Sequence, residues 1–107
     1  MNKMIIGALA LGVMASSAYA GCTADRCTGK INKLYMTASG TLFVGTDGDE
    51  RALDCKAANG RYMSLVEGDV GKNAMYSLLL TAKTTGKPVS IRIQKGTTNC
   101  RVLYVTD

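Results

Sequence analysis

Apolar and polar residues alternate along several short segments after residue 20, and glycine or polar residues separate these segments. Strict alternation is the pattern of a strand with one buried face, as at Val89, Ile91 and Ile93. Ser39–Gly40 lies between two such segments and predicts a two-residue hairpin turn. The predicted strands are residues 30–38, 41–46, 51–55, 62–66, 89–94 and 100–105.

One segment has a helical period instead of an alternating one. Its apolar residues recur at i, i+3, i+4 and i+7, which places them on one face of a helix. Gly86 suits the left-handed position that follows a helix, and the proline two residues later prevents continuation. We therefore predict a helix at about residues 72–85. The residues of its apolar face are Met75, Leu78, Leu79 and Ala82.

One helix among short strands is typical of the OB-fold, in which a helix closes one end of a small five-stranded barrel. The sequence therefore predicts a mainly β protein. We expect a small OB-fold-like barrel of five to six strands, with the helix between the fourth and fifth strand segments. Residues 21–107 are long enough for one such domain and too short for two.

The first twenty residues have the pattern of a cleaved signal peptide. Lys3 precedes an apolar run at residues 4–14, and Ala18 and Ala20 are the small residues of a cleavage site. The apolar run is too short to span a bilayer, so we expect no membrane span. A lipoprotein signal with Cys22 as the acylated residue is the alternative. Residues 21–107 are thus predicted to be periplasmic or secreted.

Four cysteines in an exported chain predict disulfide bonds, and three pairings are possible. We favour Cys22–Cys27 together with Cys55–Cys100. The first pair closes a short loop just before the first strand, and the second closes a long one. The chain-entropy model gives such loops about 2 and about 4 kcal/mol of stabilisation, respectively.

The composition limits the chemistry that the chain can perform. It has no histidine, and paired cysteines provide no thiolate, so we expect no enzyme activity, catalytic residue, metal ligand or cofactor. The acidic turn 47–50 is predicted to be a solvated hairpin tip, because a calcium site needs more ligands. The net charge is +5, but the basic residues are spread along the chain and aromatic residues are few. We therefore expect no nucleic-acid partner.

Residues 75–91, MYSLLLTAKTTGKPVSI, carry a family resemblance. They resemble the helix and next strand of the subtilase cytotoxin B subunit, in which a tyrosine-bearing helix runs into Thr-Thr-Gly-x-Pro-Val-x-Ile. The start of the domain, at Thr28–Gly29, also looks similar. Pertussis-like toxin B subunits share this architecture. The resemblance implies an OB-fold that forms pentamers, binds cell-surface glycans and accompanies a catalytic A subunit.

The resemblance also implies roles for single residues. Thr28 stands where the B subunits have a sialic-acid-binding serine, and Ile93 stands where they have a tyrosine. Helices line the central pore of the toxin pentamers. A second stripe of residues on the predicted helix, beside its apolar face, is therefore a candidate oligomer interface. Alternatively, this stripe covers the edge of the barrel. The stripe consists of Tyr76, Leu80 and Lys83. The aromatic residues available to contact a sugar are Tyr35, Phe43, Tyr62, Tyr76 and Tyr104.

The sequence therefore favours a non-catalytic exported binding module that recognises a glycan or a protein partner. The alternative is a periplasmic inhibitor or immunity protein that blocks an envelope-targeting enzyme. A structural envelope component without a specific ligand is the third possibility.

Overall fold

The computed structural model describes residues 20–107, and residues 1–19 of the predicted signal peptide lie outside this range. The described chain is mainly β with one α-helix, as the sequence predicts, and it also contains one short 3₁₀ segment. The elements are β1 (Gly21–Cys22), β2 (Arg26–Gly29), β3 (Ile31–Met36), β4 (Leu42–Thr46), η1 (Glu50–Ala52), β5 (Met63–Leu65), α2 (Lys72–Thr85), β6 (Val89–Ile93) and β7 (Val102–Thr106).

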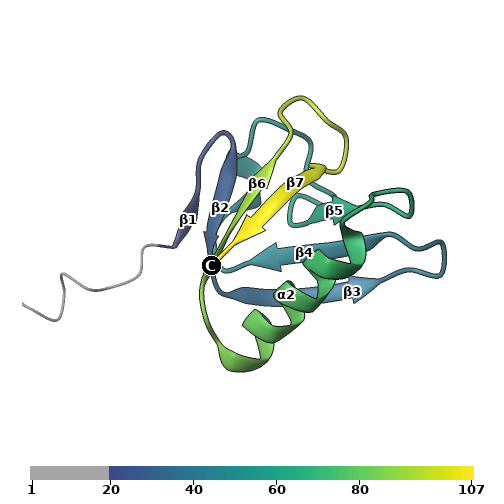
Figure 1. The fold of residues 1–107 in the computed structure, drawn as a ribbon. Coiled ribbons are helices and arrows are strands. Elements are labelled where there is room, and N and C mark those ends of the chain that lie inside the picture. The colour runs from purple at the N-terminus through teal and green to yellow at the C-terminus, as the bar shows by residue number, and fades with distance from the viewer. Residues whose placement is uncertain (1–19) are drawn as a thin grey trace, which may run out of the picture.

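The strands form two sheets, which Figure 1 shows on either side of the junction between β2 and β3. The first sheet has the order β1-β2-β6-β7 and the second has the order β3-β4-β5, and neighbouring strands within each sheet are antiparallel. Only Lys30 separates β2 from β3, so one stretch of chain contributes to both sheets. A single parallel bridge between Ser64 and Arg101 connects the other edges. Within residues 20–107 the sheets do not form a continuous closed barrel.

The helix α2 has the bounds that the sequence predicts, although it follows the fifth strand rather than the fourth. Gly86 adopts a left-handed φ of 73° and its N–H donates to the carbonyl of Ala82, which ends the helix. The helix lies across the β3–β4 hairpin (Figure 1). Leu79 and Ala82 are buried, whereas Leu78, predicted for the same face, is 37% exposed.

The core lies between α2 and the inner faces of the two sheets. Alternation fixes which strand residues enter it, because successive side chains point to opposite faces. The fully buried large side chains are Leu42, Val44, Met63, Leu65, Leu79, Ile91 and Ile93. At the start of α2, the ammonium of the buried Lys72 donates to the carbonyl of Gly40 at 2.6 Å and to Glu67 at 3.2 Å. This contact fixes the helix to the turn of the β3–β4 hairpin.

Residues 51–55 do not form the predicted strand. The side chain of Asp49 accepts a hydrogen bond from the backbone N–H of Arg51 at 3.0 Å, which starts the 3₁₀ turn η1 instead. Two short strands that the sequence did not predict, β1 and β2, precede the hairpin. The hairpin turn is also longer than expected, because Met36 and Leu42 are the last paired residues.

Both expected disulfide bonds are present in the structure, as Cys22–Cys27 and Cys55–Cys100. The first joins directly paired residues of β1 and β2. The second joins residues 45 positions apart and connects the loop after η1 to the residue two before β7. Two disulfides are typical of a protein that folds in an oxidising environment. In residues 20–107, no helix combines the length and apolar character needed to cross a bilayer.

Candidate functional site

A polar hollow of about 940 Å³ lies where the start of β3, the β4–η1 turn and the loop before β5 come together. Three separate segments of the chain therefore contribute to one concave surface. Pockets of this size bind small molecules or single sugar units in many proteins. The lining residues are Asn32, Lys33, Thr46, Asp47, Gly48, Asp49, Glu50, Arg51, Asn59, Gly60, Arg61 and Tyr62.

The acidic residues of the hollow are already engaged with the protein. The carboxylate of Asp49 accepts two hydrogen bonds from the Arg51 guanidinium, at 3.0 and 3.1 Å, and these hold the pKa of Asp49 below its usual value. Glu50 is buried, and its carboxylate accepts from the N–H and the hydroxyl of Thr46 at 2.7 and 2.6 Å. Asp47 accepts from the backbone N–H of Lys30. These carboxylates are therefore part of the wall, and the predicted solvated tip is wrong for Glu50.

Two of the three basic residues that line the hollow form no ion pair within residues 20–107. Lys33 and Arg61 are exposed, and neither takes part in the ion pairs formed within residues 20–107. The amide side chains of Asn32 and Asn59 line the same space. The hollow thus presents two available cations and two amides, which together suit an acidic, hydroxyl-rich ligand.

An aromatic cluster adjoins the hollow on the face of the second sheet that points away from the core. Tyr35 and Phe43 are opposite each other in the β3–β4 register, and their rings stack with centroids 5.2 Å apart. The ring of Tyr62 lies edge-on, 5.5 Å from Tyr35 and 6.4 Å from Phe43. All three side chains are half-buried. Tyr62 belongs to both features, so the aromatic surface continues into the polar hollow.

Gly45 makes room for this arrangement. A side-chain carbon at this position would lie 3.1 Å from the Tyr62 ring and 3.2 Å from the side-chain oxygen of Asn32. A methyl group there would push both neighbours, because these separations are shorter than ordinary carbon contacts. The glycine in β4 therefore sets the position of Tyr62 at the edge of the hollow.

No protein-family model, curated protein or solved structure matches this chain. The likeness to toxin B subunits therefore stays a prediction.

Thr28, the sugar-binding candidate from the sequence, lies outside the hollow. It is half-buried on β2, and its hydroxyl is 3.4 Å from that of Ser90 on β6. Ile93, at the position of the B-subunit tyrosine, is buried in the core. The structure does not place these two residues beside Lys33 or Tyr62 in the wall of the hollow.

The three residues of the helix stripe have different surroundings. Tyr76 is half-buried and packs against the core, whereas Leu80 is 41% exposed. Lys83 is exposed in the last turn of α2. The stripe therefore combines an edge-covering residue with two that are available for contact.

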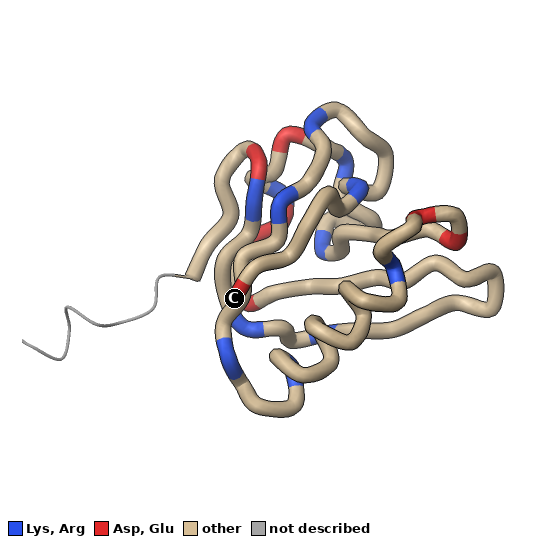
Figure 2. The backbone as a smooth tube through the Cα atoms, viewed as in Figure 1, with Lys and Arg blue, Asp and Glu red and all other residues tan. Residues whose placement is uncertain are grey.

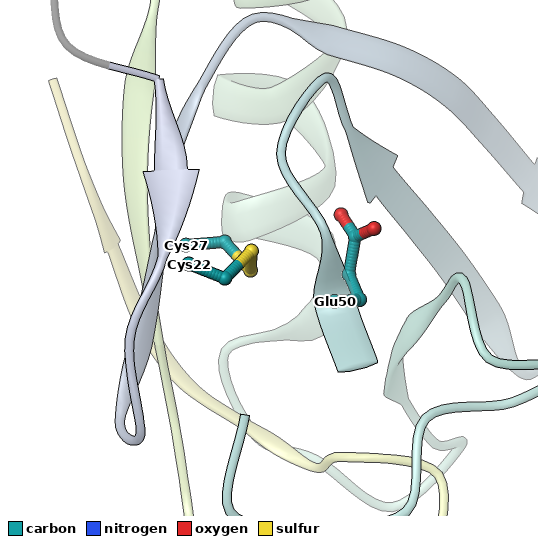
Figure 3. A group of neighbouring side chains, drawn as sticks. All are labelled: Cys22, Cys27 and Glu50. Atoms are coloured by element: carbon teal, nitrogen blue, oxygen red, sulfur yellow. A yellow bond between two sulfur atoms is a disulfide. The ribbon is translucent and has the colours of Figure 1, made fainter. Parts of the chain in front are cut away.

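The Cys22–Cys27 disulfide faces η1, which carries Glu50 (Figure 3). The two sulfurs and a carboxylate oxygen of Glu50 lie within 4.8 Å of one another. A metal site would need thiolates, and these sulfurs are bonded to each other. The group is therefore a packing contact between the β1–β2 hairpin and the wall of the hollow.

The aromatic residues of the cluster are visible in the sequence, but their assembly is not. Tyr35 and Phe43 become neighbours only through the hairpin register, which the longer turn sets. Lys33 and Arg61 have no distinguishing sequence pattern. The available signal is Gly45, because a glycine inside an apolar strand often marks a close approach by another group.

Proposed function

We propose that this protein is a non-catalytic, exported binding module whose hollow and aromatic cluster hold a glycan. The observation that carries the proposal is the double role of Tyr62, which links an aromatic surface to a polar hollow. Sugars have apolar C–H faces and hydroxyl edges, so they need both kinds of surface. An aromatic ring supplies the apolar contact at small entropic cost because it has few rotatable bonds.

The charges of the hollow favour an acidic sugar over a neutral one. Lys33 and Arg61 are the available donors, while the acidic residues are bonded internally. Guanidinium groups bind carboxylates through paired, charge-assisted hydrogen bonds. A glycan that ends in a carboxylate-bearing sugar therefore fits best.

The strand order supports an OB-fold-like interpretation. The β2–β3 stretch pairs with β4 in one sheet and with β6 in the other, and the Ser64–Arg101 bridge connects β5 to the chain just before β7. This circular order with an inserted helix is compatible with a small Greek-key barrel. Together with the disulfides and the predicted signal peptide, it favours a periplasmic or secreted module of the B-subunit type.

Binding to an array of matched acidic and neutral oligosaccharides tests the proposal. We expect selective binding of acidic glycans, and we expect Tyr62→Leu to weaken it about tenfold because the ring contact is lost. Tyr62→Phe keeps the ring and should keep most of the affinity. Tyr104→Leu removes an aromatic ring elsewhere and serves as the control. Equal losses for Tyr62→Leu and Tyr104→Leu, or no glycan binding, would contradict the proposal.

A second proposal, that the protein assembles through α2 and β7, rests on exposed apolar side chains. These two elements are in contact with each other. Large exposed apolar side chains gathered on neighbouring elements are typical of protein-contact surfaces. The exposed residues are Leu78, Leu80, Leu103 and Tyr104. We propose a second copy of the chain as the occupant, as in a pentameric B subunit.

Light scattering after size exclusion tests this assembly. The wild-type domain should have the mass of a closed oligomer, and Leu80→Asp should shift it toward one subunit by placing a charge in an apolar contact. Ala74→Asp adds the same charge at another exposed position of α2 and should leave the mass unchanged. A single-subunit mass for the wild type at all concentrations excludes self-assembly. A stable one-to-one complex with an envelope-targeting enzyme would then favour the inhibitor or immunity interpretation.

A further inference from the structure

Two arginines lie directly opposite each other on the outer face of the first sheet. Arg26 of β2 pairs with Arg92 of β6 in the antiparallel register, and Figure 2 shows the basic positions of these strands as neighbours. Opposed like charges destabilise a sheet unless a counter-charge lies between them. Neither arginine belongs to the hollow proposed as the glycan site.

The carboxylate of Asp25 forms an ion pair with both arginines. The two oxygens of Asp25 lie 3.4 Å from Nε of Arg26 and 3.4 Å from Nε of Arg92. Burial raises the pKa of Asp25, but hydrogen bonds from Arg26 and Thr23 and the charge of Arg92 outweigh this effect and hold the pKa below its usual value. The carboxylate is therefore ionised, and the group of three side chains keeps one uncompensated positive charge.

The arginines also have unused hydrogen-bond donors. Nε of Arg92 is buried beside Asp25, where it forms the 3.4 Å ion pair but no hydrogen bond, so the donors that can face a ligand are the Nη groups. None of the hydrogen bonds within residues 20–107 involves a terminal Nη atom of Arg26 or Arg92, whereas Arg51 contacts Asp49 through both Nε and Nη2. The side chains of Arg26 and Arg92 are 41% and 34% exposed, so a ligand can reach them.

Polar groups surround the pair on the same face. Tyr104 of β7 is opposite Arg92 in the register and is 41% exposed. The next row of the sheet carries hydroxyl groups, which can bond the remaining oxygens of an anion or the hydroxyls of an attached sugar. These hydroxyl-bearing residues are Thr28, Ser90 and Thr106.

We propose that Arg26 and Arg92 form a binding site for a tetrahedral oxyanion, the phosphate or sulfate group of an inorganic ion or a sugar ester. Such an anion has enough oxygen atoms to accept from both guanidinium groups at once. It also removes the excess positive charge that the opposed arginines leave on the sheet. The site is separate from the glycan hollow, so either proposal can fail without the other.

Calorimetric titration with sulfate and phosphate, at ionic strength held constant with chloride, tests the site. We expect saturable one-site binding that Arg92→Gln weakens about tenfold or more, because a charge-assisted contact is lost. Lys87→Gln removes one positive charge from the exposed turn after α2, outside both proposed sites, and should leave anion affinity unchanged. Asp25→Asn should tighten binding, because it removes the carboxylate that competes with the anion. A purely structural ion pair would not produce this increase.

Calorimetric titration also distinguishes a sugar ester from a free inorganic ion as the ligand. Tighter binding of N-acetylglucosamine 6-sulfate or glucose 6-phosphate than of the inorganic ions supports a sugar ester as the ligand, and equal affinities support a free anion. Binding that is not saturable overturns the proposal. Equal losses for Arg92→Gln and Lys87→Gln also overturn it, because they indicate a response to net charge alone.

Discussion

Replacing Leu79 with alanine should lower the free energy of unfolding by about 2–5 kcal/mol. Leu79 is fully buried where α2 meets the sheets, so truncation removes buried methyl groups and leaves a cavity between α2 and the strands. Urea denaturation followed by circular dichroism measures the change. For a domain of this size, such a loss is a large part of its total stability.

Leu80→Ala is the matched control, because the same side chain is shortened one position further along the helix. Leu80 is 41% exposed, and the single-chain domain should lose about 0.5 kcal/mol or less. Measurements at low protein concentration separate this effect from any contribution of assembly. Similar losses for the two variants would show that the helix is rotated from the orientation described above.

Removing the Cys55–Cys100 disulfide should destabilise the domain by about 4 kcal/mol, and removing Cys22–Cys27 by about 2 kcal/mol. The difference arises because the sequence separations are 45 and 5, and the longer loop restricts the unfolded chain more. Denaturant midpoints of the two double Cys→Ala variants, measured under identical conditions, should fall in this order.

The two variants form a well-matched comparison. Each pair has one fully buried cysteine, Cys27 or Cys100, and one half-buried partner. The loss of packing is therefore similar, and the difference between the variants reports mainly the loop length. A larger loss for the Cys22–Cys27 variant would falsify the loop-entropy explanation and point to the packing of that bond against Glu50.

Local sequence signals predict the elements that are governed by local contacts. The helix ends where Gly86 and Pro88 require it, and the strand at Val89–Ile93 follows the strict alternation of its side chains. Residues 51–55 fail as a strand because a side chain, that of Asp49, starts a turn by bonding the backbone two residues later. Such competition depends on a single rotamer, which alternation of apolar residues cannot reveal.

The candidate site depends on contacts between separate segments of the chain, and this explains why the sequence names its aromatic residues as candidates but does not predict that they form one cluster. Tyr35 and Tyr62 meet only after β3, β4 and β5 pair in one register, and a shift of one residue would turn Tyr35 into the core. The burial of Glu50 has a similar origin, because the hydroxyl of Thr46 supplies the partner that a buried carboxylate needs. Both features belong to the assembled sheets.

The Cys55–Cys100 disulfide also determines whether a single proteolytic cut separates the chain into two molecules. The loop between β5 and α2 contains Val70, whose side chain is fully exposed, so it is an accessible cleavage point. Cys55 and Cys100 lie on opposite sides of Val70, and a cut there leaves two fragments that stay covalently joined. Every residue that lines the hollow remains on the first fragment, while the second keeps α2, β6 and β7 attached to it. In a compartment rich in proteases, a nicked molecule can therefore persist as a single particle until the Cys55–Cys100 bond is reduced.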